Sequence, residues 1–386
     1  VWRTFVVEER FGFNKMTPAL FFADLAKEAL LAVCVGVPLL AAVLWLMEHM
    51  GSLWWLHVWL VWLTFNLLVL LIYPTFIAPL FNKFTPMGES LLIDSGYPDF
   101  GGRDRDRILK VIRDVAGLKQ LDHAVVSHWH LDHYGNHAAL AAKIKIGQFW
   151  DRGMPDMLQE DPKFGEKAAA YRAAAQNQSK ALKVGDSLPL KSGETPLTMK
   201  VVTASGEVLP NEGEPNPFAY LHVPQADDPS DNAKSLSELL SFGKFRFLTC
   251  GDLTWNIEAK LMMPNNPLGK VDLFMVTHHG LNVSNNPVLV RAIDPRVAVI
   301  CNGPTKGANA STLATLRAVS SLQAWYQLHR NVQLDEFSQT PAAFIANQED
   351  TSACRGIWIK ASVEPDGAGY TVQIGPQGKP TRYATR

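Results

Sequence analysis

The 386 residues are enough for one large hydrophobic core or for two smaller modules. A net charge of −1 excludes an overall basic character of the kind used to bind nucleic acid, although it leaves room for a local basic patch. The cysteines Cys34, Cys250, Cys301 and Cys354 are widely separated, which excludes a CxxC metal or redox motif and fits a reducing compartment.

Two long uncharged stretches near the start predict a pair of transmembrane helices. Residues 29–47 carry no charge over 19 positions, and residues 53–81 carry none over 29 positions. Each stretch is long enough to cross a hydrocarbon core of about 30 Å at about 1.5 Å per residue. We therefore expect an all-α transmembrane hairpin within residues 1–87, in contact with membrane lipid.

The residues around these stretches predict the orientation of the hairpin. The link Glu48–Ser52 contains no lysine or arginine, whereas basic residues lie on both outer flanks. These flanking residues are Arg3, Arg10, Lys15, Lys27 and Lys83. Because short cytoplasmic segments are enriched in lysine and arginine, both flanks are expected in the cytoplasm. The prediction is a multi-pass protein of a bacterial-type inner membrane, with everything after Lys83 cytoplasmic.

The phrases VVEERFGFNKMTPALFFADLAKEALL and LLIYPTFIAPLFNKFTPM, both within residues 1–87, resemble the N-terminal membrane region of the CAAX prenyl protease family. The resemblance implies a family of integral-membrane zinc peptidases whose chemistry depends on a later HExxH helix. No histidine in this chain is followed by glutamate. The protease active site is therefore absent, and no catalytic residue is carried over from this region.

From Gly88 onward, short apolar runs alternate with stretches of helical spacing, which is typical of a layered α/β fold. Predicted strands cover residues 91–93, 124–127, 245–249, 273–277 and 297–301, and predicted helices cover residues 104–116, 136–144 and 312–319. Residues 358–363 and 370–374 predict a β-hairpin around Asp366–Gly367. Residues 152–235 are polar, with scattered proline and glycine, and are predicted to form long loops or insertions.

The segment SHWHLDHYGNH, residues 127–137, concentrates candidate metal ligands directly after a predicted strand. It contains His128, His130, Asp132 and His133. Two histidines two positions apart on an extended segment point the same way and can bind one ion, while the following aspartate and histidine can turn toward a second. Imidazole and carboxylate ligands suit Zn²⁺, with Mn²⁺ or iron as alternatives.

This HxHxDH pattern resembles the ligand signature of the metallo-β-lactamase superfamily, and the resemblance extends from Gly88 to the C-terminal region. It implies an αββα sandwich, here lacking its first hairpin because FNKFTPM runs directly into GESLLIDSG. It also implies that Asp94 orients the ligand loop by hydrogen bonds and that Asp252 bridges two ions. A histidine of FMVTHHG would bind the second ion. A strand-end position favours His278, and a following glycine favours His279, so both remain open.

The chain departs from the superfamily pattern at the third motif, where a histidine normally completes the first ion's ligands. Between His133 and Asp252 the only histidines in the sequence are His137 and His222, which are interpreted as an ordinary helix residue and an ordinary strand residue. The segment DNAKS, with Asn232 and Ser235, has the better position. Members resembling the C-terminal domain of the competence protein ComEC carry a polar motif here and a later HHG, so the resemblance implies a weakly held first ion.

The segment CNGPTKGANAS, residues 301–311, follows a predicted strand and precedes a predicted helix. In ComEC-like members this loop lies at the mouth of the site. The resemblance implies that Asn302, Lys306 and the amides at the start of the helix could contact an anionic group of the substrate.

Together these resemblances imply a metal-dependent hydrolase with two Zn²⁺ per site, or Mn²⁺ in their place. Asp132, Asp252 and His279 are the expected catalytic residues: the ions would lower the pKa of a bridging water, Asp252 would position it, and whichever of His278 and His279 does not ligate could protonate a leaving group. A phosphodiester or nucleic acid is the expected substrate, with a lactam, lactone or thioester as the alternative. A non-catalytic membrane protein with a vestigial metal site, or a chimeric fusion or truncation joined near residues 84–90, is the competing hypothesis. The sequence indicates no protein partner.

Overall fold

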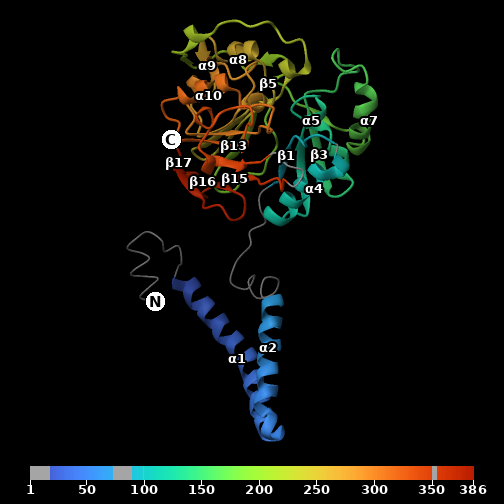
Figure 1. Ribbon diagram of the computed structural model, residues 1–386, viewed down its shortest axis with the longest axis vertical. Coiled ribbons are helices and arrows are strands. Elements are labelled where there is room, and N and C mark those ends of the chain that lie inside the picture. The colour runs from blue at the N-terminus through green and yellow to red at the C-terminus, as the bar shows by residue number, and fades with distance from the viewer. Residues whose placement is uncertain (1–17, 73–88, 99, 350–353) are drawn as a thin grey trace. The chain divides into compact units, whose positions relative to one another are not determined.

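The computed structural model describes residues 18–72, 89–98, 100–349 and 354–386 (Figure 1). The chain divides into an N-terminal unit, Val1–Met87, and a C-terminal unit, Gly88–Arg386. The N-terminal unit contains α1 (Pro18–His49) and α2 (Trp54–Ile72), joined by a short 3-10 turn.

The two helices of the N-terminal unit contact each other and have the character of membrane spans. The stretches Phe21–His49 and Gly51–Leu68 are long and apolar enough to cross a bilayer, and only 6% and 0% of their most apolar windows are buried. Most of their side chains are therefore exposed in the described part of the chain. The first helix is longer than predicted. The second was predicted to reach residue 81, and residues 73–81 lie outside the described part of the chain.

The first layer of strands in the C-terminal unit is a parallel sheet in the order β1-β2-β3-β4. Its strands are β1 (Leu91–Ile93), β2 (Gln120–Val125), β3 (Lys145–Asp151) and β4 (Lys180–Ala181). Helices α4 (Arg103–Lys110), α5 (Leu131–Tyr134), α6 (His137–Ala141) and α7 (Phe164–Ala174) belong to this half of the unit. Ala124 and Val125, at the end of β2, are fully buried, and so is Val126 directly after the strand. Such burial is typical of a parallel strand that is covered on both faces.

The second layer is a mixed sheet in the order β14-β13-β12-β11-β9-β8-β5-β6. Its strands are β5 (Leu197–Ala204), β6 (Glu207–Val208), β8 (Ser237–Phe242), β9 (Phe245–Thr249), β11 (Leu273–Met275), β12 (Val297–Ile300), β13 (Ala324–His329) and β14 (Ile345–Asn347). Helices α8 (Trp255–Met262), α9 (Pro287–Ile293) and α10 (Ala310–Arg317) pack with this sheet around a large apolar core. A small ribbon pairs β7 (Glu214–Pro215) with β10 (Asn265–Asn266).

The two sheets pack face to face, which makes the αββα sandwich. Val125 and Trp150 of the first sheet share a core with Met199, Val201 and Leu236 on the second. The rest of the inner face of the second sheet is covered by an antiparallel sheet of β15 (Ile359–Val363), β16 (Gly369–Ile374) and β17 (Thr381–Ala384). The predicted absence of the first hairpin concerns residues before β1, and residues 73–88 lie outside the described part of the chain.

Most predicted elements are present, and the hairpin of β15 and β16 pairs Ser362 with Thr371 as an antiparallel ladder. The predicted helix 104–116 is α4 followed by one π-helical turn, Val111–Val115. The prediction of loops throughout residues 152–235 is wrong, because this segment contains α7 and β5. The buried residues of α7 are Phe164, Ala168 and Tyr171. Because the middle one is a small alanine, the helical spacing of apolar residues is hard to recognise in the sequence.

Candidate metal centre

The predicted ligands lie at the carboxyl ends of strands that reach the same edge of the sandwich. β9 ends shortly before Asp252, and β11 ends shortly before His278 and His279. These two strands and β12 are parallel neighbours, so the residues after them meet at one edge. The loop after β2 brings His128 and His133 to the same place, across the interface between the sheets.

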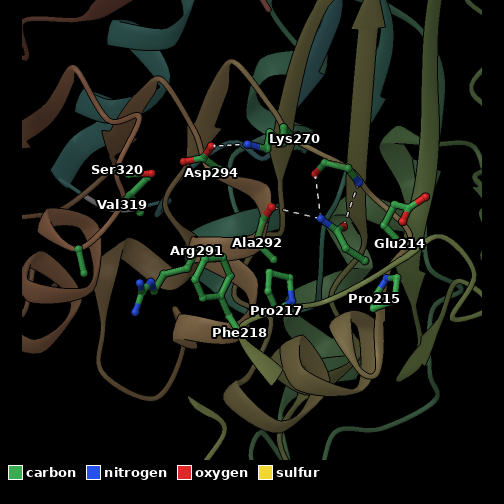
Figure 2. A pocket seen from close by; sticks show the side chains of 13 residues that line it. Glu214, Pro215, Pro217, Phe218, Lys270, Arg291, Ala292, Asp294, Val319 and Ser320 are labelled. Carbon is green, nitrogen blue, oxygen red and sulfur yellow. Dashed lines mark hydrogen bonds and ion pairs between the residues drawn. The ribbon is translucent and has the colours of Figure 1, made fainter. Parts of the chain in front are cut away.

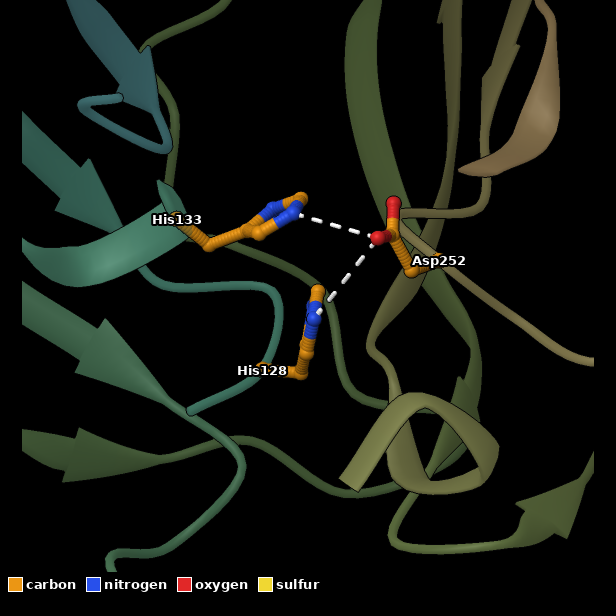
Figure 3. Close-up of side chains that lie close together, drawn as sticks. All are labelled: His128, His133 and Asp252. Carbon is orange, nitrogen blue, oxygen red and sulfur yellow. Dashed lines mark ion pairs between the residues drawn. The ribbon is translucent and has the colours of Figure 1, made fainter. Parts of the chain in front are cut away.

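The carboxylate of Asp252 is the centre of this cluster and is only 3% exposed. Its Oδ2 lies 3.3 Å from His133 Nε2, 3.4 Å from His278 Nε2, 3.6 Å from His279 Nε2 and 3.9 Å from His128 Nε2. Figure 3 shows the rings of His128 and His133 pointing at this oxygen. Asp252 Oδ2 thus lies within 3.9 Å of four imidazole nitrogens.

Asp132 forms a second group of possible ligands beside the first. Its Oδ2 lies 3.7 Å from His279 Nε2, and its Oδ1 lies 3.9 Å from His133 Nε2. Candidate ligand atoms within 4.8 Å of one another therefore form two sets, His128/His133/Asp252 and Asp132/His133/His279. The two sets overlap at His133, so they lie next to each other. Of the histidine pair, His279 is the one that reaches Asp132.

The unpaired nitrogens of the cluster fit a divalent cation. The buried Nε2 atoms of His128, His133 and His279 have no hydrogen-bond partner among the residues that the structure describes. A buried imidazole nitrogen without a partner is costly, whereas a lone pair aimed at a metal ion is satisfied. The donor set of imidazoles and carboxylates is the one that Zn²⁺ and Mn²⁺ accept.

The opposite ring nitrogen of each histidine is held by the surrounding structure. Nδ1 of His128 lies 3.1 Å from Ser127 Oγ, and Nδ1 of His278 lies 3.1 Å from Ser284 Oγ. Nδ1 of His279 lies 2.9 Å from the carbonyl oxygen of Cys301. Such contacts fix ring orientation and select the tautomer whose Nε2 faces the ion.

Asp94 lies behind the ligand loop, in the place that its predicted role requires. Its carboxylate accepts hydrogen bonds from the backbone N–H of Ser127 (2.8 Å), from Ser127 Oγ (2.7 Å) and from His133 Nδ1 (2.8 Å). One carboxylate therefore fixes both the start of the ligand loop and the ring at its end. Asp94 itself has left-handed backbone, with φ 58°.

Burial and the close approach of histidines to carboxylates shift the pKa values of the cluster in both directions. Burial lowers the pKa of His128 well below its usual value, so this ring is neutral. Burial acts to raise the pKa of Asp252, but the neighbouring histidines, His133 first, hold that pKa well below its usual value. Burial likewise opposes a charge on His133, yet Asp252 and Asp94 raise its pKa well above normal, so this ring carries a proton that an ion bound at its Nε2 would displace.

Left-handed backbone conformations place several of these groups. His278 and His279 have φ of 52° and 55°, a conformation that is uncommon for residues with a side chain. This turn lets two consecutive histidines approach the same carboxylate. Gly251 precedes Asp252 with φ 54°, and a Cβ there would lie 3.0 Å from Ser127 Cβ. Glycine therefore allows the strand end to approach the ligand loop closely.

The third-motif segment lies beside the cluster, while the two other histidines do not join it. Ser235 Oγ accepts a hydrogen bond from the backbone N–H of Asp252 at 3.2 Å. Asn232 is 8% exposed, and its Oδ1 has no partner within the described residues. His137 is buried against aromatic rings, and the Nδ1 of His222 contacts the side-chain amide of Asn286 at 3.0 Å. Neither histidine belongs to the two ligand sets.

The loop after β12 reaches the centre through Lys306. Its Nζ lies 3.0 Å from Asp132 Oδ2, while half of its side chain is exposed. Asn302 instead donates its side-chain N–H groups to the carbonyl oxygens of Gly303 (2.9 Å) and His329 (2.7 Å), so it holds the loop in shape. Lys306 is therefore the residue of this loop that contacts the candidate ligand Asp132.

His130 is oriented by a residue that the sequence did not reveal. Its Nε2 lies 3.2 Å from Oε1 of Glu160, and it belongs to neither ligand set. Burial works against the ionised form of Glu160, but hydrogen bonds, including those from the Asp231 amide and His130, hold its pKa below normal. Asp231 also accepts a hydrogen bond from the backbone N–H of Trp129 at 2.7 Å. The serines Ser127 and Ser284 were missed too, although Ser127 directly precedes the first ligand.

A separate pocket of about 420 Å³ lies elsewhere in the C-terminal unit (Figure 2). Its lining includes Phe218, Lys270, Arg291 and Asp294, and none of the predicted site residues. The guanidinium of Arg291 lies 4.5 Å from the Phe218 ring, and Lys270 Nζ lies 2.9 Å from Asp294 Oδ2. These cations contact groups of the fold itself, so the pocket offers no cluster of metal ligands.

Comparison with known families divides the chain into the same kinds of region. Residues 1–83 match the family described as CAAX prenyl protease N-terminal, five membrane helices, and residues 84–228 match the metallo-beta-lactamase superfamily. A CAAX prenyl protease 1 homolog of Dictyostelium discoideum is 42% identical over 87 residues, which are 22% of this chain and 20% of that protein. The human homolog is 36% identical over 92 residues, 24% of this chain and 19% of that protein. The chain thus spans about a fifth of the length of these curated relatives.

Solved structures with a similar arrangement include metal-dependent hydrolases. A hydrolase of the beta-lactamase superfamily has a TM-score of 0.36 at 13% identity, covering 62% of this chain and 85% of that one. Zn²⁺-bound PqqB from Methylobacterium extorquens has a TM-score of 0.31 at 12% identity, covering 62% and 75%. Because these TM-scores and identities are low, the likeness to the metallo-beta-lactamase superfamily rests on the family match over residues 84–228.

Proposed function

We propose that this chain, in which an N-terminal membrane region of the CAAX prenyl protease type precedes a metallo-β-lactamase domain, is a membrane-anchored hydrolase with a dinuclear Zn²⁺ centre. The observation that carries the proposal is that the Nε2 atoms of His128, His133 and His279 lie within 3.9 Å of Asp252 Oδ2 and have no hydrogen-bond partner among the described residues. A structural histidine cluster would need hydrogen-bond partners for these nitrogens.

The residues would divide between two ions as the resemblance to the superfamily implies. His128, His130 and the third-motif segment would bind the first, Asp132, His133 and His279 the second, and Asp252 would contact both; of these, the second group and its Asp252 neighbour are the better assembled in the structure. His278 reaches Asp252 as well and is the alternative to His279. When bound, the ions would supply an activated water and polarise an oxygen of the substrate. Mn²⁺ is the alternative metal.

Residues of the chain would perform the remaining tasks of hydrolysis. Asp252, ionised and buried, would orient the attacking water, and Asp94 would keep the loop with His133 in register. Lys306, at the mouth beside Asp132, would contact a negative group of the substrate. A cation in this position favours a phosphodiester or nucleic acid over a neutral lactam, lactone or thioester.

Substrate class and metal dependence can be tested together on the purified full chain in detergent. We expect hydrolysis of bis-p-nitrophenyl phosphate to appear with Zn²⁺ or Mn²⁺ and to keep rising beyond the first equivalent. The rise is expected because the amide of Asn232 is a weaker ligand than imidazole, so the first ion is held loosely. Turnover of nitrocefin, a lactone or a thioester without phosphodiester turnover would favour the carbonyl alternative. Well under one bound ion, with no turnover of any of them, would support a vestigial site.

The membrane region leads to a proposal about location. We propose that the C-terminal unit lies on the cytoplasmic side of a bacterial-type inner membrane, supported by basic residues on both flanks and none in Glu48–Ser52. A reporter inserted at Gly51 should read external, and one fused after Lys83 should read cytoplasmic. The reverse pair of signals would contradict this orientation, and recovery of the protein in the soluble fraction would contradict membrane anchoring.

A further inference from the structure

One histidine of the centre is held in the opposite way from the others. The rings of His128, His133, His278 and His279 are contacted at Nδ1, which leaves Nε2 toward Asp252. The ring of His130 is contacted at Nε2, by Oε1 of Glu160 at 3.2 Å. In a ligating histidine the nitrogen away from the ion usually donates its hydrogen to a carboxylate or carbonyl. The contact with Glu160 therefore leaves Nδ1 of His130 as its ligand atom.

Glu160 is itself fixed in position by the third-motif segment. Its Oε1 also accepts the backbone N–H of Asp231 at 2.6 Å, one residue before Asn232. The carboxylate of Asp231 in turn accepts the backbone N–H of Trp129, which lies between His128 and His130, and pairs with Arg152. A single chain of contacts thus connects the two segments that would bind the first ion.

We propose that Glu160 is a positioning residue for the first ion: its carboxylate accepts the Nε2–H of His130, presents Nδ1 to the ion and fastens the turn that carries Asn232. The proposal rests on the proposed metal centre, because it assigns a task to a side chain behind a ligand. The location of Glu160 predicts that its removal weakens binding of the first ion and not of the second. Glu160 contacts His130 and Asp231, whereas no contact is recorded between it and Asp132, His133 or His279 of the second set.

The test is a Zn²⁺ competition titration against a chromophoric chelator, with the full chain in detergent. Glu160→Ala should weaken the first ion by about 10- to 100-fold, the usual effect of removing a partner behind a ligand, and leave the second ion unchanged. Glu160→Gln should retain part of the affinity, because its amide oxygen can still accept the Nε2–H. The matched control is Glu166→Ala, an exposed carboxylate in the first turn of α7. It should change neither ion.

A double-mutant cycle with His130→Ala separates positioning from general destabilisation. If Glu160 acts through His130, then Glu160→Ala should cost little further first-ion affinity in the His130→Ala background. Equal weakening of both ions, with no recovery in Glu160→Gln, would show a merely structural role and overturn the inference, as would an unchanged first ion in Glu160→Ala. A wild-type chain that binds no stoichiometric Zn²⁺ would instead overturn the proposed function. The visible spectrum of the Co²⁺ form gives a second readout, since a changed ligand set shifts its bands.

Discussion

Replacement of Asp252 by asparagine is expected to abolish hydrolysis and to remove the tightly bound metal. The substitution keeps the shape of the side chain but deletes the buried charge that four histidines surround. Without the metal, the transition state loses several kcal/mol of stabilisation. Because about 1.4 kcal/mol corresponds to a factor of ten in rate, kcat/KM should fall by about 10³-fold or more. Turnover of bis-p-nitrophenyl phosphate and metal content after desalting measure the two effects.

The matched control is Asp156→Asn, an exposed aspartate in the loop after β3. It should keep both the activity and the metal of the wild type, because solvent already screens its charge. An Asp252→Asn chain that retains two ions and comparable turnover would show that the buried carboxylate does not organise the centre. The dinuclear assignment would then be wrong, whatever the substrate.

The parts of the centre that could be predicted from sequence are those encoded locally. His128, His130, Asp132 and His133 follow one another within six residues, and Asp94, Asp252 and the His278–His279 pair each come just after a strand. Carboxyl ends of parallel strands meet at one edge of a sheet, which groups Asp94 with the ligand loop and Asp252 with the histidine pair, and the packing of the two sheets then brings both groups together. The same reasoning could not choose between His278 and His279, because both have left-handed backbone that depends on neighbouring loops.

The parts that could not be predicted depend on contacts between distant segments. Glu160 lies in a stretch without periodicity, and its contact with His130 exists only because the loop after β3 returns to the edge of the sheet. β5 lies in a segment predicted to be loop from its polar composition and scattered proline and glycine, although it pairs with both β8 and β6 in the second sheet. Burial in the tertiary structure overrides such local signals.

The organisation of the chain assigns the chemistry to its C-terminal unit. The two family matches adjoin at residues 83 and 84, and the two units of the structure meet at Met87 and Gly88. All candidate ligands lie between residues 128 and 279, and the HExxH motif of CAAX prenyl proteases is absent from the sequence. The membrane region would then serve to anchor the hydrolase, and the proposed reaction needs no residue from it.

Trp129 connects the stability of the C-terminal unit to the geometry of its metal centre. It lies between His128 and His130, is 1% exposed, and its ring centroid is 5.6 Å from that of Tyr134, 5.8 Å from Phe164 and 5.1 Å from Tyr171. Its indole N–H donates to the carbonyl oxygen of Gly153 at 3.0 Å. The ligand loop is therefore anchored in an aromatic core on one side while its histidines face the ions on the other.

Trp129→Ala is expected to lower the free energy of unfolding of this unit by about 3–5 kcal/mol, because it leaves a large cavity among aromatic rings. Trp129→Phe should cost less, since a ring still fills most of the space and only the bond to Gly153 is lost. Phe337→Ala is the control: Phe337 is 92% exposed, and its loss should stay within about 0.5 kcal/mol.

Pulse proteolysis in urea, followed on the fragment that contains the C-terminal unit, measures these changes in the full chain. The cavity should also loosen His128 and His130 together, so first-ion affinity should fall in Trp129→Ala even under conditions where the unit remains folded. A Trp129→Ala chain as stable as the Phe337→Ala control would mean that the aromatic cluster does not support the ligand loop. Full stability loss with unchanged first-ion affinity would mean that the core and the centre are independent, since the ligands would then keep their positions without the ring that anchors them.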